Sequence, residues 1–267
     1  SGGMEPNEGC LNYNDWNVLI DFISEYNAFN NLLPVDIVDE IHWVVDSNNE
    51  HRLVELDMHN INPKLKGSIP NSIGFLDKLE KIDMSNNELN GSIPLSIGNL
   101  LSLEEIKLSY NELDGTIPSE VINLPQLRTL YLYGNNLNGE LPEFSDNLLI
   151  EELKLYNNNL SGDIPSSIGS LNNLIQVNLD KNSFTGEIPN SLLLINDLTI
   201  IKLSHNQISG SLSDQICNIN RVFLHDNNLT GSIPECVCDM IYISLSNNSF
   251  CNDSPSCIDI GQQNCSP

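Results

Sequence analysis

Basic residues are scarce in this chain. Its 267 residues include 11 lysines and arginines against 36 aspartates and glutamates, which gives a formal net charge of −25. A charge this negative repels nucleic acid, anionic lipid headgroups and polyanionic polysaccharide. Long hydrophobic runs are also missing, and no stretch approaches the roughly 20 apolar residues that a membrane helix needs. We therefore expect no nucleic-acid partner and no membrane span.

Cysteine is nearly absent from the first 216 residues, where Cys10 stands alone. Six cysteines crowd the remainder of the chain: Cys217, Cys236, Cys238, Cys251, Cys257 and Cys265. Such a cluster is typical of disulfides and hence of an oxidising compartment, so we expect a secreted protein of the extracellular space or cell wall. The spacing Cys236-x-Cys238 is too short for the usual paired zinc ligands, and no metal or cofactor is expected.

The most prominent feature that is present is a repeat. The phrase Leu79-x-x-Ile82-x-Met84-x-x-Asn87-x-Leu89-x-Gly91-x-Ile93-Pro94 returns along the chain. Its asparagine recurs at intervals of 24, 24, 23, 24, 24, 21 and 21 residues, at Asn87, Asn111, Asn135, Asn158, Asn182, Asn206, Asn227 and Asn248. This is a leucine-rich repeat, in which no single turn can bury its apolar residues without neighbouring turns.

The chemistry of a stacked coil gives each repeat position a structural role. The apolar residues point inward, and the recurrent asparagine lies where the chain leaves the strand. Its side-chain amide can satisfy backbone groups of adjacent turns and so form a ladder. The glycine, as at Gly91 and Gly115, suits a backbone with positive φ, and the proline after the isoleucine ends strand pairing on the convex side.

These features predict an α/β solenoid, a right-handed leucine-rich-repeat superhelix with a parallel sheet on its concave face. Residues 1–52 form an N-terminal cap, with helices expected over 15–26 and 34–41 and a hairpin between 43–45 and 53–56. Eight repeats follow over 53–239. A partial ninth repeat and a disulfide-rich cap occupy 240–267.

Cys217 and Cys238 occupy the same phase of successive 21-residue turns. Stacked strands lie about 4.7–4.9 Å apart, and a disulfide spans Cα separations of about 4.4–6.8 Å. We therefore predict a Cys217–Cys238 disulfide. The pairing of Cys236, Cys251, Cys257 and Cys265 stays open, and Cys10 is expected to be a free, buried thiol.

The phrase LxGxIP, found at residues 89–94 and 229–234, resembles the plant-specific class of extracellular leucine-rich repeats. That class includes polygalacturonase-inhibiting proteins and the ectodomains of receptor-like proteins and receptor kinases. The resemblance covers about residues 53–250, and the length is most similar to a stand-alone polygalacturonase inhibitor. It implies a concave face that binds a pectin-degrading enzyme and modulates its activity. The alternative is a receptor-type ectodomain that binds a peptide or a co-receptor.

Three positions of each turn, the variable residues x3, x5 and x7 of LxxLxLx, project from the concave face. Over nine turns they hold five of the eleven basic residues and six acidic ones, so this face nets −1. Tyrosine and arginine are frequent anchors of protein interfaces. The candidate partner-binding residues are Lys81, Asp83, Lys107, Tyr131, Tyr133, Lys154, Tyr156, Lys202, Arg221, Phe223, His225 and Tyr242.

Other functions have weaker support. Carboxylates and histidines lie in different turns with no nucleophile motif, so we expect no enzyme. Ice binding favours a regular array of threonines, and the chain has only five, while a purely structural wall or matrix role stays open. Six sequons permit N-glycosylation without requiring it, at Asn90, Asn159, Asn228, Asn247, Asn252 and Asn264.

Overall fold

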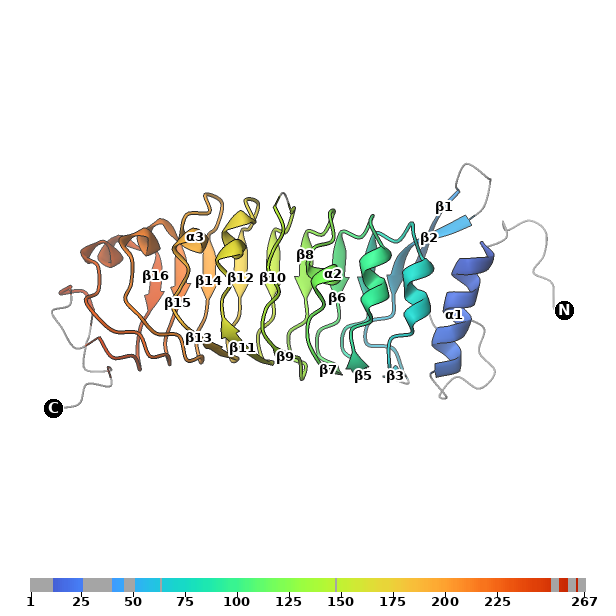
Figure 1. Ribbon diagram of the computed structural model, residues 1–267, viewed down its shortest axis with the longest axis horizontal. Coiled ribbons are helices and arrows are strands. Elements are labelled where there is room, and N and C mark those ends of the chain that lie inside the picture. The colour runs from blue at the N-terminus through green and yellow to red at the C-terminus, as the bar shows by residue number, and fades with distance from the viewer. Residues whose placement is uncertain are drawn as a thin grey trace.

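The repeats wind the chain into an elongated solenoid with one long sheet (Figure 1). The computed structural model describes residues 12–25, 40–45, 51–62, 64–146, 148–250, 255–258 and 263. Nine strands run parallel, and β1 adds to β2 antiparallel at the N-terminal edge. In sheet order the strands are β1 (Glu40–Val45), β2 (His51–Asp57), β4 (Lys81–Asp83), β6 (Glu105–Lys107), β8 (Thr129–Tyr131), β10 (Glu152–Lys154), β12 (Gln176–Asn178), β14 (Ile200–Lys202), β15 (Arg221–Phe223) and β16 (Tyr242–Ser244).

Shorter strands and single helical turns complete each coil. Two three-stranded parallel sheets consist of β3 (Lys66–Gly67), β5 (Glu88–Ser92) and β7 (Glu112–Asp114), and of β9 (Asn138–Gly139), β11 (Asn159–Asp163) and β13 (Ser183–Thr185). The helical turns are η2 (Asn71–Phe75), η3 (Leu95–Asn99), α2 (Ser119–Ile122), η4 (Ser166–Ser170), α3 (Asn190–Leu193), η5 (Asp214–Asn218) and η6 (Glu235–Asp239). Proline precedes all of these turns except η5, because its fixed φ suits a helix start and its missing N–H needs no partner there. Among the described residues, no helix has the length and apolar character needed to cross a bilayer.

The predicted asparagine ladder is confirmed and is continuous. Asn135 Nδ2 donates to the carbonyls of Leu108 (3.0 Å) and Leu132 (2.9 Å), and its Oδ1 accepts from the Leu113 N–H at 3.0 Å. The Leu108 carbonyl also accepts from Asn111 of its own turn at 3.0 Å. Each ladder asparagine therefore satisfies backbone groups in two turns. The same pattern holds at the other seven positions, Asn87, Asn111, Asn158, Asn182, Asn206, Asn227 and Asn248.

Two positions of each turn have left-handed backbone. Gly91 and Gly115 have φ of 71° and 72°, as predicted for the repeat glycine. The residue directly before the ladder asparagine, called x8 here, is also left-handed, although it is rarely glycine. The x8 residues with positive φ are Asn86, Tyr110, Gly134, Asn157, Lys181, His205, Asp226 and Asn247, together with Asn60, which holds the same position in the first repeat although Ile61 follows it. The backbone N–H groups of those from Asn60 to Asp226 donate to the next turn, as Tyr110 does to the Tyr133 carbonyl at 2.9 Å, which offsets the unfavourable φ.

The N-terminal cap is attached through a buried ion pair. Helix α1 (Tyr13–Glu25) confirms the first predicted helix. Its Asp15 is fully buried and accepts from Arg52 Nε at 3.2 Å and from the Leu53 N–H at 2.8 Å, and Arg52 also pairs with Asp77 of the first repeat. The predicted hairpin is confirmed as β1 and β2. The second expected helix was wrong at its end, because residues 40–41 already belong to β1, while residues 34–39 and Cys10 lie outside the described residues.

The disulfides differ from the prediction. Cys217 pairs with Cys236 (Cα–Cα 6.0 Å), and Cys238 pairs with Cys257 (Cα–Cα 5.7 Å). The predicted Cys217–Cys238 disulfide is therefore wrong. Cys251 and Cys265 lie outside the described residues.

The error arises because these cysteines lie in helical turns and not in strands. Each helical turn has a central buried apolar residue. The residue that follows it faces, in the next helical turn, the residue that precedes the central one. A Cβ added to Gly74, which follows buried Ile73, would lie 2.5 Å from the carbonyl oxygen of Ser96, which precedes buried Ile97. The equivalents of Gly74 and Ser96 are Cys217 and Cys236, so a covalent bond replaces the same close approach.

Replacing Asn135 by alanine should destabilise the protein by about 3 kcal/mol. The change leaves the buried Leu113 N–H without an acceptor, which alone costs about 1–3 kcal/mol, and removes two further hydrogen bonds. Urea unfolding measures the effect. The neighbouring, exposed Asn136→Ala is the control and should change the stability by less than about 0.5 kcal/mol. Equal effects of the two changes would contradict the ladder's role.

Replacing Cys238 by serine should release the thiol of Cys257 and leave Cys217 oxidised. Alkylation under denaturing, non-reducing conditions followed by peptide mass spectrometry identifies the released thiol. Labelling of Cys217 in this variant would contradict the structure and restore the Cys217–Cys238 pairing.

Candidate functional site

The predicted partner-binding residues lie on the long sheet or just beyond its strands, in columns set by the register. Lys81 and Asp83 are on β4, near the N-terminal edge, where Lys81 Nζ is 3.9 Å from Glu55. A middle group comprises Lys107, Tyr131, Tyr133, Lys154 and Tyr156. A C-terminal group comprises Lys202, Arg221, Phe223, His225 and Tyr242. Asp83 stands in register with Lys107 on the neighbouring strand, so the first two groups adjoin, whereas the C-terminal group begins two strands beyond Lys154.

Aromatic rings gather in the middle group. The rings of Tyr133 and Tyr156 stack with centroids 4.4 Å apart and an angle of 8° between their planes. Tyr131 lies 6.0 Å from Tyr133, and Tyr110 meets the Tyr133 ring edge-on at 5.1 Å. We call Tyr110, Tyr131, Tyr133 and Tyr156 the tyrosine cluster. It spans three successive turns and presents amphipathic rings beside one another.

Charged side chains hold one end of the tyrosine cluster in place. Lys154 Nζ lies 4.3 Å from the centroid of the Tyr131 ring, 2.8 Å from its hydroxyl oxygen and 2.5 Å from Glu152 Oε2. The Tyr131 hydroxyl donates to the same carboxylate. Lys107 approaches the Tyr131 ring at 5.9 Å and pairs with Glu105 at 2.8 Å. Each lysine is thus paired with a carboxylate of its own strand.

These contacts shift the pKa values of the groups involved. Burial alone raises the pKa of Glu152, but hydrogen bonds from Lys154 and Tyr131 outweigh it and hold this pKa below its ordinary value. Burial raises the pKa of Tyr156, and its hydrogen-bonded tyrosine neighbours raise it further. The Tyr156 hydroxyl therefore remains protonated at neutral pH.

A hollow of about 600 Å³ lies beside the tyrosine cluster. Its lining includes the tyrosine cluster and Lys154, together with Asn178, Asp180 and Lys202 from the next two turns. Burial raises the pKa of Asp180, against the lowering effect of the Ser204 N–H and of Lys202. The hollow combines aromatic surface with amide, carboxylate and ammonium groups.

The C-terminal group is a smaller aromatic patch. Lys202 Nζ lies 5.1 Å from the centroid of the Phe223 ring, whose centroid is 4.8 Å from that of Tyr242. Arg221 is exposed on β15. This patch continues the aromatic surface toward the C-terminal edge of the sheet.

The comparisons with known proteins agree with this architecture. Models of the leucine-rich repeat match residues 77–137, and also 149–171 and 197–219. The ectodomain of the receptor kinase GASSHO1/SCHENGEN3 from Arabidopsis thaliana, solved with CASPARIAN STRIP INTEGRITY FACTOR 2, is 36% identical over 70% of this chain and 23% of its own, with a TM-score of 0.65. The Arabidopsis receptor kinase HAESA, solved with the peptide hormone IDA and the co-receptor SERK1, is 33% identical over 76% of this chain and 35% of its own, with a TM-score of 0.70.

The chain belongs to the leucine-rich-repeat proteins of the plant extracellular type. It spans about a quarter to a third of the length of these receptor structures. A plant ice-binding protein, 22% identical over 94% of this chain and 99% of its own with a TM-score of 0.53, shares the fold. A search of curated sequences finds no match for this leucine-rich-repeat protein.

Sequence reasoning missed Tyr110, which completes the tyrosine cluster. It counted only x3, x5 and x7 as facing outward from the concave side. Tyr110 is an x8 residue, and its left-handed backbone directs its ring against Tyr133. The signal that could have found it is the position directly before each ladder asparagine.

Replacing Lys154 by methionine should raise the pKa of Glu152, because the burial remains while the largest opposing hydrogen bond is lost. Carbon-detected NMR titration of the carboxyl groups measures this pKa. Lys66→Met is the matched control, since Lys66 pairs with Glu88 at 2.6 Å on another sheet and should leave Glu152 unchanged. A Glu152 pKa that does not move in Lys154→Met would contradict the proposed network.

Proposed function

We propose that this protein is a secreted recognition module that binds a peptide segment on its concave face, as a receptor-type ectodomain does. The observation that carries the proposal is the tyrosine cluster beside the 600 Å³ hollow. Its rings offer stacking surface, and their hydroxyls offer polar ends for hydrogen bonding. Such side chains are enriched at the energetic centres of interfaces.

The proposed surface is pre-organised. Tyr133 and Tyr156 stack on each other, and the Lys154–Glu152 pair fixes Tyr131. Because these side chains are already held in position in the free protein, they lose less rotamer entropy when a ligand binds. A peptide laid along the solenoid would cross several strands and meet the tyrosine cluster first and the Phe223–Tyr242 patch next.

The structural neighbours favour this alternative over the polygalacturonase-inhibitor hypothesis. The similar receptor HAESA was solved in complex with the peptide hormone IDA, and also together with the co-receptor SERK1. The inhibitor hypothesis rested on the length of the chain, whereas the peptide-binding proposal rests on the side chains of the concave face. The tyrosine cluster would serve either partner by steric and aromatic complementarity, and we assign it no catalytic role.

An extracellular location is part of the proposal. Its support is the two disulfides and the likeness to extracellular ectodomains. The sequon residues Asn90, Asn159, Asn228 and Asn247 have exposed side chains, so glycans could be attached there without disturbing the core. Asn252 and Asn264 lie outside the described residues.

Selection from a random 12-residue peptide display library tests the proposal. The immobilised protein should enrich peptides that carry aromatic or large apolar side chains and are neutral or basic overall. Tyr156→Ala and Lys154→Glu should each weaken binding of the enriched peptides by about tenfold or more, as loss of an interface anchor costs about 1–2 kcal/mol or more.

The controls are Tyr13→Ala and Lys66→Glu, which remove an exposed tyrosine and reverse an exposed lysine away from the concave face. Both should bind the enriched peptides as the parent protein does. Failure to enrich any peptide, or equal losses in the controls, would overturn the peptide-binding proposal. An added arm with fungal polygalacturonases, in which hydrolysis is altered by the parent and not by Tyr156→Ala, would instead restore the inhibitor hypothesis.

A further inference from the structure

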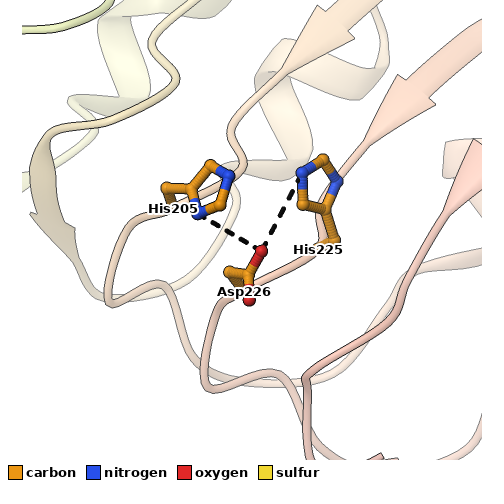
Figure 2. A group of neighbouring side chains, drawn as sticks. All are labelled: His205, His225 and Asp226. Carbon is orange, nitrogen blue, oxygen red and sulfur yellow. Dashed lines mark ion pairs between the residues drawn. The ribbon is translucent and has the colours of Figure 1, made fainter. Parts of the chain in front are cut away.

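Two histidines and an aspartate from adjacent turns converge near the C-terminal end of the concave face (Figure 2). His205 is the x8 residue of the turn that follows β14. His225 and Asp226 are the x7 and x8 residues of the turn that follows β15. The left-handed backbone of His205 and Asp226, with φ of 55° and 57°, brings their side chains toward His225.

The ligand atoms are close to the spacing that a small metal ion requires. His205 Nδ1 lies 3.2 Å from Asp226 Oδ2, and His225 Nε2 lies 3.9 Å from the same oxygen. One ligand atom from each residue lies within 4.8 Å of the others. A tetrahedral zinc site with bonds of about 2.0–2.1 Å sets its ligand atoms about 3.3 Å apart. The pair formed by His205 and Asp226 already meets this spacing. The His225 nitrogen, which lies within 4.8 Å of both other ligand atoms, has to approach them by at most about 1.5 Å.

Two serine hydroxyls contact the other ring nitrogen of His225. His225 Nδ1 lies 3.0 Å from Ser204 Oγ and 3.1 Å from Ser244 Oγ, one hydroxyl from each neighbouring turn. With its proton on Nδ1, the ring directs the lone pair of Nε2 toward Asp226. Metal-binding histidines are oriented in this way, through a hydrogen bond from the nitrogen that does not bind the metal.

We propose that His205 Nδ1, His225 Nε2 and a carboxylate oxygen of Asp226 bind one zinc ion, with a fourth position left for water. Two imidazoles and one carboxylate suit zinc and its neighbours in the first transition row, whereas calcium and magnesium prefer oxygen ligands alone. The Asp180 carboxylate acts electrostatically on both imidazoles, and the net charge of −25 raises the local concentration of cations.

Zinc bound here would join the turns of β14 and β15. The Cys217–Cys236 disulfide joins η5 and η6, the helical turns of the same two coils. The site would therefore stabilise the C-terminal end of the solenoid, and it would also place a cation beside the aromatic patch of Phe223 and Tyr242.

Isothermal titration with zinc chloride, after removal of metals by a chelator, tests the proposal on the whole protein. We expect one zinc per chain, a rise in the melting temperature, and no competition from calcium or magnesium. His205→Gln and His225→Gln should each weaken zinc binding by about tenfold or more, since even loss of an outer partner of a metal site costs about 10–100-fold.

His59→Gln is the matched control, because His59 Nδ1 lies 2.6 Å from Asp57 Oδ1 in a histidine–aspartate pair outside the three-residue group. This variant should bind zinc as the parent does. Circular dichroism confirms that the variants are folded, and cobalt substitution should give the visible spectrum of a tetrahedral site that both His205→Gln and His225→Gln abolish. The absence of zinc binding, or stoichiometric binding that survives in both variants, would overturn the proposal.

Discussion

Each ladder asparagine joins two turns through three hydrogen bonds, and the carbonyl between two successive asparagines, such as that of Leu108, accepts from both. These amides sit where the chain leaves the strand and can no longer bond as a regular sheet. They therefore extend the pairing of the parallel strands beyond the strands themselves, in an apolar interior where an unpaired backbone group is costly. Because the ladder fixes the offset between turns, the side chains at one repeat position form straight columns along the solenoid. The concave surface is a product of that alignment.

The x8 position shows how the ladder also shapes the candidate sites. The x8 residue directly precedes the asparagine, and its backbone N–H donates to a carbonyl of the next turn. A left-handed φ allows this hydrogen bond. This conformation carries the x8 side chain to the edge of the concave face, next to the x7 residue. Tyr110 meets Tyr133 in this way, and His205 meets His225. Both notable clusters of the surface thus combine x7 and x8 residues, and both arise from a backbone constraint that serves stability first.

The sequence was sufficient for features that depend on repeat phase alone. The strands, the ladder and the left-handed glycines follow from the period, since equivalent residues of parallel strands stand directly beside one another. Phase did not predict the disulfides, because in a single helical turn the side chains before and after the buried residue point toward opposite neighbours. Cys217 therefore meets Cys236 and not its phase equivalent, Cys238. Phase places Tyr110, His205 and Asp226 at x8, but the direction of an x8 side chain follows from its left-handed φ, which the apolar pattern of the repeat does not show.

The distribution of charge limits the partners that can reach the tyrosine cluster. The concave lysines lie against carboxylates of their own strands, Lys107 with Glu105 and Lys154 with Glu152, so the surface is locally almost neutral. Farther from the surface, the electrostatic potential is set by the net charge of −25. Physiological salt screens this potential beyond about 8–10 Å. An acidic partner is repelled before it reaches the rings, whereas a neutral or basic one is not. For a partner bound there as proposed, Lys107 and Lys154 are already paired with carboxylates, so stacking on the tyrosines would be the main source of affinity. Discrimination among partners at this surface would then rest on the fit of side chains to the rings and the hollow, with charge acting mainly on the rate of encounter.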